Sequence, residues 1–263
     1  MPLDLAHLGP KGTNAETAAI AYADWLQKNH GETVRLLPYP SIAQTLYAAS
    51  DRAVDLAIVP VENSTEGGIA ITLDTLWERG NLQIQQELVL PIIHVLLSRG
   101  IALEGIKTVY SHPQALGQCQ KWLERNLPQA RLSATNATTE AIQFIQQDPT
   151  GAAIASPRAA QLYDLPTLAT DIKDYPDNCT RFWVLGTETS LQGTHTALAF
   201  SRNINLSRIE SLPTKRSLGE YLFFMDLESS QADSRLQDVL TELGNYTEVL
   251  KVFGSYFILS LQK

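Results

Sequence analysis

The stretch LDLAHLGPKGT (Leu3–Thr13) contains the pattern that decides the fold. Its apolar half, Leu3–Leu8, predicts a β-strand, Gly9–Thr13 predicts a turn, and a helix is expected from about Asn14 to Lys28. Short apolar runs and helix-like segments continue to alternate through the first three quarters of the chain. This alternation is typical of βα units, and it predicts an α/β fold with mainly parallel sheets.

Later runs set the limits of this region. The unbroken apolar run Val54–Val59 predicts a buried strand that ends at Pro60, and Leu82–Leu97 predicts one long strand or two, interrupted at Pro91. Near residues 191–194 the pattern changes, and a smaller α+β part is expected beyond this boundary. The elements predicted there are the strands Thr196–Phe200, Ile204–Leu212, Glu220–Leu227 and Val249–Phe257 and the helix Ser234–Leu243.

Composition excludes several classes of function. The 263 residues are enough for two domains, and a hydrophobic content of 44% is ordinary for a soluble protein. The longest apolar stretch, Leu88–Leu97, is too short to span a membrane, and the first residues show no secretory signal. A net charge of −8 without a basic run argues against nucleic acid or an anionic membrane as partner. Cys119 and Cys179 form neither a disulfide framework nor a metal-ligand pattern, so we expect a reducing, cytoplasmic setting and no metal.

Polar loops at the carboxyl ends of strands form the candidate site, because open α/β sheets bind ligands there. Four loops place Gly, Ser or Thr immediately before a helix: Gly9–Thr13, Asn63–Gly68, Ser111–Gln114 and Ala137–Thr139. Helix N-termini carry unpaired N–H groups and partial positive charge, so converging loops would hold a carboxylate or phosphate. Arg181 would add a bidentate contact. The alternative is that these side chains only cap their helices.

The same loops carry a resemblance to a known family. Four motifs, in this order and spacing, are similar to the signatures of the prephenate dehydratases: LGPKGT (Leu8–Thr13), VPVENSTEG (Val59–Gly67), YSHPQAL (Tyr110–Leu116) and NCTRF (Asn178–Phe182). The resemblance runs from residue 3 to about residue 187. It implies a lyase of phenylalanine biosynthesis that converts prephenate to phenylpyruvate, releasing carbon dioxide and water, and that needs no metal or organic cofactor.

The resemblance also implies roles for particular residues. Thr180 would hydrogen-bond the departing hydroxyl, Arg181 would orient the substrate or the cleft, and Phe182 would complete the catalytic group. The substrate-binding residues would be Gly12, Thr13, Glu62, Asn63, Ser64, Thr65, Gly67, Ser111, His112, Gln114, Thr138 and Thr139. For His112, a purely structural role at the start of a helix stays an alternative.

The architecture implied by the resemblance has two parts. Residues 1–190 would form a two-lobed catalytic domain that is periplasmic-binding-protein-like (type II), with lobe one at 1–78 plus 167–190, lobe two at 79–166, and the site in the cleft between them. Residues 194–263 resemble an α+β, ferredoxin-like ACT regulatory domain. Phenylalanine is the implied effector, homodimers or homotetramers are the implied assemblies, and the implied allosteric residues are Asn205, Leu206, Ile209, Glu210 and Ser211.

One part of the regulatory domain does not fit. An ACT domain has the order βαββαβ, yet the strand Ala197–Ser201 is followed almost at once by Ile204. A crossover between parallel strands needs at least about 10 residues, so the first crossover helix has no room. Three explanations stay open: residues are missing from the numbered sequence, the helix is truly deleted, or the domain is rearranged.

Two other functions remain open at this point. Arogenate dehydratase would use the same chemistry and the same motifs on a substrate with an amino acid side chain. A non-catalytic small-molecule sensor would use the same lobes for binding alone, although the intact Thr180-Arg181-Phe182 motif argues against it.

Overall fold

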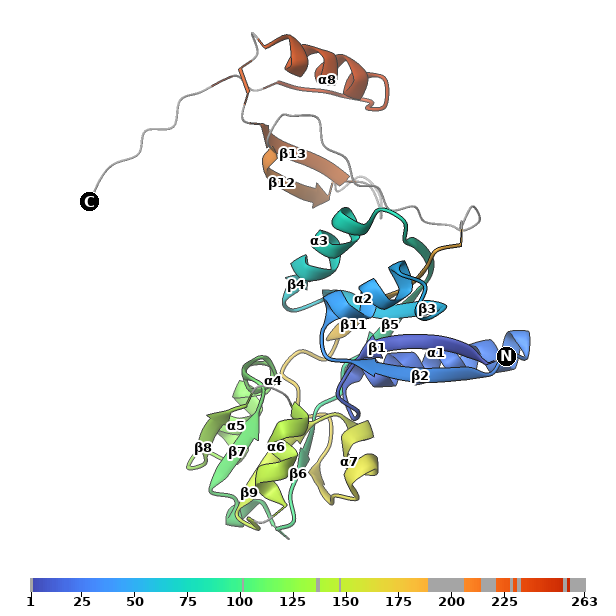
Figure 1. Ribbon diagram of the computed structural model, residues 1–263. Coiled ribbons are helices and arrows are strands. Elements are labelled where there is room, and N and C mark those ends of the chain that lie inside the picture. Colours follow the sequence, from blue (N-terminus) through green and yellow to red (C-terminus); the bar gives the residue numbers. More distant parts are fainter. Residues whose placement is uncertain are drawn as a thin grey trace. The chain divides into compact units, whose positions relative to one another are not determined.

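A computed structural model of the chain describes residues 2–100, 102–135, 138–146, 148–188, 206–213, 221–227, 229–230, 233–252 and 255. The chain divides into two compact units, residues 1–194 and 195–263. Figure 1 shows the ribbon with the element labels used below. Within the described residues, no helix has the length and apolar character that a membrane span requires.

The first unit contains two sheets. The first sheet has the order β2-β1-β3-β11-β5, with the short β4 paired to β3. Its strands are β1 (Leu3–Leu8), β2 (Val34–Tyr39), β3 (Leu56–Asn63), β4 (Gly67–Gly68), β5 (Gln83–Pro91) and β11 (Cys179–Gly186). Its helices are α1 (Asn14–His30), α2 (Ile42–Ser50) and α3 (Ala70–Arg79).

The second sheet has the order β10-β6-β9-β7-β8. Its strands are β6 (Val95–Leu97), β7 (Thr108–Ser111), β8 (Arg131–Ala134), β9 (Gly151–Ala155) and β10 (Thr167–Ala169). The helical elements beside it are η1 (Leu103–Gly105), α4 (Pro113–Gln118), α5 (Gln120–Asn126), α6 (Thr138–Ile145) and α7 (Pro157–Tyr163). Both sheets are mixed, since β11 runs antiparallel to β3 and β5, and β6 runs antiparallel to β9 and β10.

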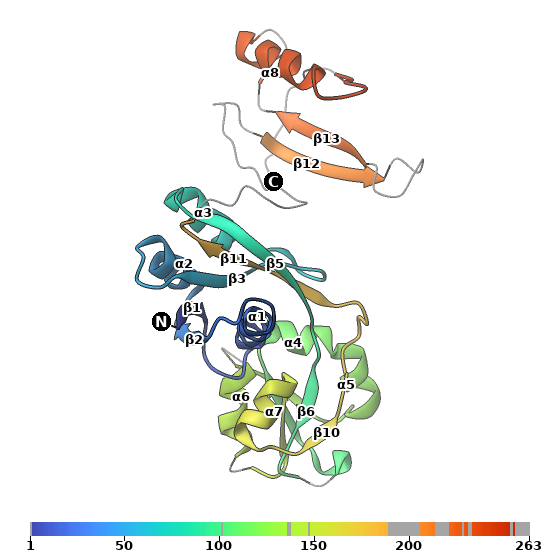
Figure 2. The ribbon, with the colours of Figure 1, turned by 90° about the vertical axis from the view of Figure 1, so that its right-hand side faces the viewer.

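The apolar positions of the first sheet explain its two helical layers. Leu5, Ile58 and Phe182 are buried against α1, while Ala6 and Leu185 are buried with residues of α2 on the other face. Successive strand residues point to opposite faces, so an unbroken apolar strand supplies both cores. Figure 2 shows α1 on one side of this sheet and α2 on the other.

Helix boundaries follow the capping residues of the sequence. Thr13 is the N-cap of α1 and accepts a hydrogen bond from the Glu16 amide at 3.3 Å, and Gly31 ends the helix with a φ of 71°. Ser41 caps α2 in the same way, accepting from the Gln44 amide. The predicted cap at Ser41 is confirmed, and glycine suits the left-handed conformation that terminates α1.

The apolar run Leu82–Leu97 forms two strands, β5 and β6, and they belong to different sheets. We call each sheet with its helices a lobe. The chain passes from the first sheet to the second just after Pro91 and returns between β10 and β11. The predicted lobe limits, 1–78 plus 167–190 and 79–166, are wrong at both joints. β5 pairs with β11 and completes the first sheet, whereas β10 pairs with β6 in the second. Strand partners are set by long-range pairing, which the local pattern does not reveal.

A second difference concerns β3, which continues past Pro60 to Asn63. The register between β3 and β11 shifts between Arg181 and Phe182, opposite Pro60. Proline lacks an N–H group and is tolerated in a sheet at such irregularities, so the predicted strand end at Pro60 is wrong. The extension matters because it brings Asn63 opposite Thr180.

The second unit is described in part. β12 (Leu206–Pro213) and β13 (Tyr221–Leu227) form an antiparallel pair, and α8 (Ser234–Gly244) begins after the N-cap Asp233. These elements match the predicted strands and helix. The predicted strand Val249–Phe257 is wrong for residues 249–252, which have no strand structure, because an apolar run forms a strand only where a partner is paired with it. Thr196–Phe200, Asn205 and the interval around residues 202–204 lie outside the described residues.

Candidate active site

The carboxyl ends of parallel strands from both sheets meet in the first unit. β1 and β3 end at Leu8 and Asn63, and hydrogen bonds connect the loops after them to the second lobe. The Ser156 hydroxyl, just after β9, donates to the Gly12 carbonyl oxygen at 2.7 Å. The Gln118 amide donates to the Thr65 hydroxyl at 2.9 Å. Each of the loops after β1 and β3 is thus hydrogen-bonded to the second lobe, the first to Ser156 and the second to Gln118, and the convergence of the polar loops on one site stays a prediction.

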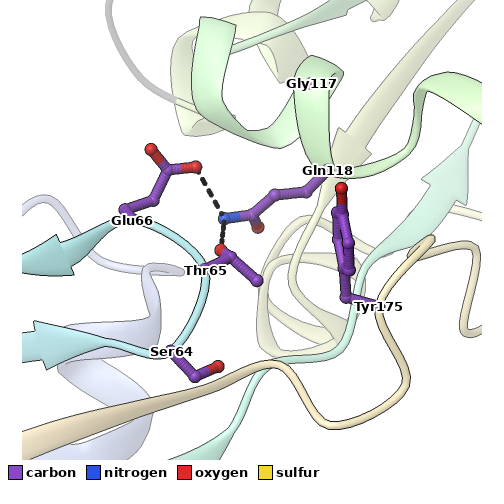
Figure 3. A pocket seen from close by; sticks show the side chains of 6 residues that line it. All are labelled: Ser64, Thr65, Glu66, Gly117, Gln118 and Tyr175. Carbon is purple, nitrogen blue, oxygen red and sulfur yellow. Dashed lines mark hydrogen bonds between the residues drawn. The ribbon is translucent and has the colours of Figure 1, made fainter. Parts of the chain in front are cut away.

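A pocket of about 450 Å³ lies where the loop after β3 faces the end of α4. It is lined by Ser64, Thr65, Glu66, Gly117, Gln118 and Tyr175. Figure 3 shows the Gln118 side chain reaching across to Thr65 and Glu66, with Tyr175 beside it. The volume is that of a small-molecule site, and five of the six lining residues have polar side chains.

Asn63 connects this pocket to Thr180. Its Oδ1 accepts from the backbone amides of Thr65 at 3.1 Å and Glu66 at 3.2 Å, so its orientation is fixed by groups that only donate. Its Nδ2 therefore faces β11, where it donates to the Thr180 hydroxyl oxygen at 2.9 Å. Because this oxygen accepts, the Thr180 O–H hydrogen remains available to donate to another group.

Gln118 occupies the centre of the polar network. Its Nε2 donates to the Thr65 hydroxyl and, at 3.3 Å, to the Glu66 carboxylate. Its Oε1 accepts from Asn178 at 2.9 Å, and Asn178 in turn accepts from Asn63 at 3.0 Å. Sequence reasoning missed Gln118 because a buried glutamine at a helix end carries no motif signal, whereas Asn178 stood in the NCTRF motif without being singled out.

Arg181 lies on the other face of β11. Adjacent strand residues point to opposite faces, so the buried Thr180 and the half-exposed Arg181 diverge. The Arg181 guanidinium contacts Glu87 through two nitrogens, at 2.7 and 3.1 Å, and Glu62 at 2.6 Å. These hydrogen bonds to two carboxylates raise the pKa of Arg181. The bidentate partner of Arg181 is thus a carboxylate of the protein, and Glu62, expected to bind substrate, is its second partner.

Phe182 is buried in the core beneath α1, where it packs with Leu5 and Ile58. Of the three residues of the TRF motif, Thr180 alone connects to the pocket network within the described residues. Phe182 packs in the core, and Arg181 pairs with carboxylates of β3 and β5, the strands on either side of β11.

The loop Gly9–Thr13 makes the second connection between the lobes. The Thr13 hydroxyl caps α1, and the buried Glu16 carboxylate accepts from the Gly12 amide at 2.7 Å and from Arg158 of the second lobe at 3.4 Å. Ser156 also accepts from the Ala159 amide as the N-cap of α7. The capping interpretation therefore holds for Thr13, and this loop also joins the lobes.

The remaining predicted binding residues are placed as follows. The Ser64 hydroxyl accepts from the Cys179 amide at 3.0 Å and lines the pocket, and Gly67, the first residue of β4, adopts a positive φ of 86°. Ser111 is fully buried and donates to the Ile154 carbonyl at 2.7 Å. His112 caps α4 by accepting from the amide of the exposed Gln114 at 3.3 Å, which is the structural alternative. Thr138 and Thr139 begin α6, and their side chains lie outside the described part.

Among the described residues, no group of three or more His, Cys, Asp or Glu side chains could hold a metal ion.

Known proteins resemble this chain over most of its length. A profile of the family described as prephenate dehydratase matches residues 5–190. The bifunctional chorismate mutase/prephenate dehydratase of Neisseria gonorrhoeae is 39% identical over 277 residues, covering 97% of this chain and 74% of that protein. The prephenate dehydratase of Lactococcus lactis subsp. cremoris is 32% identical over 285 residues, covering 98% of this chain and 99% of that protein. The solved structure of a prephenate dehydratase from Arthrobacter aurescens, in complex with L-Phe, has a TM-score of 0.63 and 31% identity, covering 92% of this chain and 86% of that one.

The mixed-sheet α/β fold and the pocket lined by polar side chains are features of a protein that binds a small molecule. The family match covers more than half of the chain, and these relatives exceed 30% identity. The chain belongs to the prephenate dehydratase family. It is a lyase that converts prephenate to phenylpyruvate with loss of water and carbon dioxide, which confirms the function expected from the resemblance.

Proposed function

We propose that prephenate binds in the pocket between the loop after β3 and the end of α4, and that Thr180 is the group that assists the departing hydroxyl. The observation that carries this proposal is the hydrogen bond from Asn63 Nδ2 to the Thr180 oxygen at 2.9 Å. Because Asn63 donates, the Thr180 hydrogen points to another acceptor. The hydroxyl oxygen at C4 of prephenate is such an acceptor.

The reaction needs little beyond this assistance. The electron pair of the bond to the ring carboxylate moves into the ring, carbon dioxide leaves, and the C4–O bond breaks with its electrons on oxygen. The ring becomes aromatic, which supplies the driving force. The departing hydroxide must gain a proton, and since a Thr hydroxyl is a weak acid, Thr180 acts as a positioned donor while water supplies the net proton. Such assistance is worth about 10² to 10⁴ in rate.

The substrate carries two carboxylates, and donors around the pocket would hold them. Ser64 and Thr65 line the pocket, and the Gly12–Thr13 loop lies at the N-terminus of α1. A helix N-terminus favours an anion through its free N–H groups and its dipole. Gln114, Thr138 and Thr139 complete the proposed binding set from the second lobe. We assign Arg181 and Phe182 to the support of β11.

Three substitutions of Thr180 test this assignment. Thr180→Val keeps the branched shape and removes the hydroxyl, Thr180→Ala removes both, and Thr180→Ser keeps the hydroxyl. Loss of Thr180 leaves Asn63 Nδ2 with Asn178 Oδ1 and the Cys179 carbonyl as acceptors, so folding should change little. We expect kcat to fall at least about 100-fold in the Val and Ala variants, with a smaller change in KM, while Ser stays near wild type.

Phenylpyruvate formation from prephenate is the measurement, with thermal unfolding as the control for folding. A folded Val variant with wild-type kcat would refute the role of Thr180. Comparing kcat/KM for prephenate and arogenate in the same assay establishes which substrate is preferred.

We also propose the finer architecture. Residues 1–190 form the catalytic domain, with the two lobes in the type II periplasmic-binding-protein arrangement, and residues 194–263 form a ferredoxin-like ACT domain. The two sheets joined by two crossings support the first assignment, and the β12–β13 pair followed by α8 supports the second. About 255 residues of this chain, 97% of 263, align over 277 residues with the Neisseria relative, so about 22 aligned positions lack a residue here. A shortfall of this size is enough for one crossover between strands, which agrees with the short interval between Ser201 and Ile204 in the sequence.

Phenylalanine is the effector that we propose for this domain, with Leu206, Ile209, Glu210 and Ser211 of β12, and Asn205 before it, as the responsive residues. The L-Phe complex of the Arthrobacter relative supports this proposal. We further propose a cytoplasmic homodimer or homotetramer. Activity titrated with L-phenylalanine, together with light scattering, tests both points. An activity curve that does not change with phenylalanine would exclude the effector role.

A further inference from the structure

His94 stands at the point where the chain crosses between the lobes. It lies between the end of β5 at Pro91 and the start of β6 at Val95, and it is only 5% exposed. Its Nε2 is 2.8 Å from Gln118 Oε1. Burial lowers the pKa of His94, so the imidazole is neutral near neutral pH. A neutral imidazole has one N–H, and the polarity of the network determines which nitrogen carries it.

The direction of every bond in this network follows from two backbone amides. Thr65 N–H and Glu66 N–H can only donate, so Asn63 presents its Oδ1 to them and its Nδ2 to Asn178 Oδ1. Asn178 then donates from Nδ2 to Gln118 Oε1. Gln118 Oε1 is therefore an acceptor, and His94 must donate to it from Nε2–H.

Gln118 thus receives hydrogen bonds from both segments that connect the lobes. His94 belongs to the first crossing, and Asn178, directly before β11, belongs to the second. With its oxygen held at both sides, the Gln118 amide can rotate only by breaking a buried hydrogen bond. Its nitrogen then stays directed at Thr65, whose hydroxyl donates to Asn63 Oδ1 at 2.6 Å.

We propose that His94 is a positioning residue for Thr180, acting through Gln118, Thr65 and Asn63. Its Nε2–H fixes the Gln118 amide, and the fixed amide holds the Thr65 hydroxyl in place against Asn63 Oδ1. Asn63, whose orientation the two backbone amides set, then keeps its Nδ2 on the Thr180 oxygen and leaves the Thr180 hydroxyl hydrogen directed at the substrate. His94 touches neither reacting atom in this scheme, and its imidazole carries no proton to or from the substrate. The inference rests on the proposed role of Thr180.

The test uses two substitutions of His94 and one matched control. His94→Phe keeps a planar ring and removes the donor, whereas His94→Gln retains an N–H group near the position of Nε2. The control is Ser98→Ala, because Ser98 is fully buried in the same lobe and donates to the Gly151 carbonyl at 2.6 Å. Ser98 comes directly after β6 and His94 directly before it, so the loss of the Ser98 hydroxyl removes a buried hydrogen bond at the opposite end of that strand without touching the network.

We expect His94→Phe to lower kcat about tenfold, since a lost buried partner costs on the order of a tenfold factor, and to leave KM within about twofold. His94→Gln should recover kcat to within about threefold of wild type. Ser98→Ala should lower the melting temperature as His94→Phe does and leave kcat unchanged. The double variant His94→Phe/Thr180→Ala should be no slower than Thr180→Ala alone, because His94 acts through Thr180.

Several results would overturn the inference. Wild-type kcat in folded His94→Phe would show that the Gln118 amide needs no support, and His94→Gln as slow as His94→Phe would show that the N–H donor is not what matters. Additive losses in the double variant would show that His94 acts independently of Thr180. Failure of the Thr180 assignment is distinguishable, because Thr180→Ala alone would then keep its kcat. Failure of the activity itself would appear as wild-type protein that forms no phenylpyruvate.

Discussion

Replacing Arg181 with Met should weaken the fold of the catalytic unit and leave substrate binding nearly unchanged. Arg181 makes three hydrogen bonds with Glu62 and Glu87, all on the face of β11 away from Thr180. The three side chains are 42%, 44% and 37% exposed, so solvent screens their attraction. Exposed pairs contribute about 0.2–1 kcal/mol each, and the bidentate geometry with Glu87 places this site at the upper end.

The two pairs together therefore stabilise the unit by about 1–2 kcal/mol. Repulsion between the two remaining carboxylates adds to this loss. Both contact the same guanidinium, so their oxygens lie within about 8 Å of each other, where two charges in water repel by about 0.5 kcal/mol. For a unit of 194 residues, a total loss of about 1.5–2.5 kcal/mol lowers the melting temperature by about 3–10 °C. Methionine preserves the length of the side chain and much of its packing.

Differential scanning calorimetry and steady-state kinetics on prephenate check both parts of this expectation. The melting temperature should fall in Arg181→Met, and the loss should shrink in high salt, while KM stays within about threefold of wild type. Glu87→Gln is the matched control, because it weakens the same cluster from the other side and keeps a polar group for Trp183 Nε1, which lies 2.8 Å from Glu87 Oε2. An unchanged melting temperature with a KM raised 100-fold would refute this reasoning and place Arg181 on the substrate.

Three further substitutions or conditions follow from the same structure. Phe182→Ala should cost about 3–5 kcal/mol by emptying a core position that is 2% exposed, and kcat per folded molecule in an unfolding-corrected assay should not change. Ser156→Ala should lower the free energy of unfolding by about 1–2 kcal/mol, because it removes both the cap of α7 and the contact with Gly12. KM should rise as well, because the Gly12–Thr13 loop loses its hydrogen bond to the second lobe. A melting temperature equal to that of wild type would contradict this expectation. Burial lowers the pKa of both His7 and His94, so below about pH 6.5 the unfolded chain binds protons that the folded chain does not. The free energy of unfolding should therefore fall as the pH drops, by at most about 1.4 kcal/mol per pH unit for each histidine. Melting curves between about pH 7.5 and 5.5 measure this slope, which should be shallower in His94→Phe.

Local signals predicted much of the first unit. The strand Leu3–Leu8 and the cap at Ser41 were read correctly, because apolar content and capping chemistry act over a few residues. The break at Pro91 was also read correctly, as one of two alternatives. The pattern did not show to which sheet each side of that break belongs, since β5 pairs with β11, about 90 residues later in the chain.

The candidate active site also combines residues that the sequence pointed to with residues that it did not. The motif residues Asn63 and Thr180 were singled out from the sequence, and the structure joins them by a hydrogen bond. Alternation along a strand is enough to expect Thr180 and Arg181 on opposite faces of β11. Gln118 and His94 carried no comparable signal, because a buried polar side chain is recognised only by the partner that satisfies it.

The sequence by itself determined the class of fold, the helix starts, the positions of the polar loops and the family, because periodicity, capping and motif spacing are local properties of the chain. Tertiary structure alone decided which loops meet, which carboxylates neutralise Arg181, and how His94 and Asn178 converge on Gln118. These outcomes depend on contacts between residues far apart in the chain. A buried hydrogen bond also has a direction, which is set by the donors and acceptors that folding brings together.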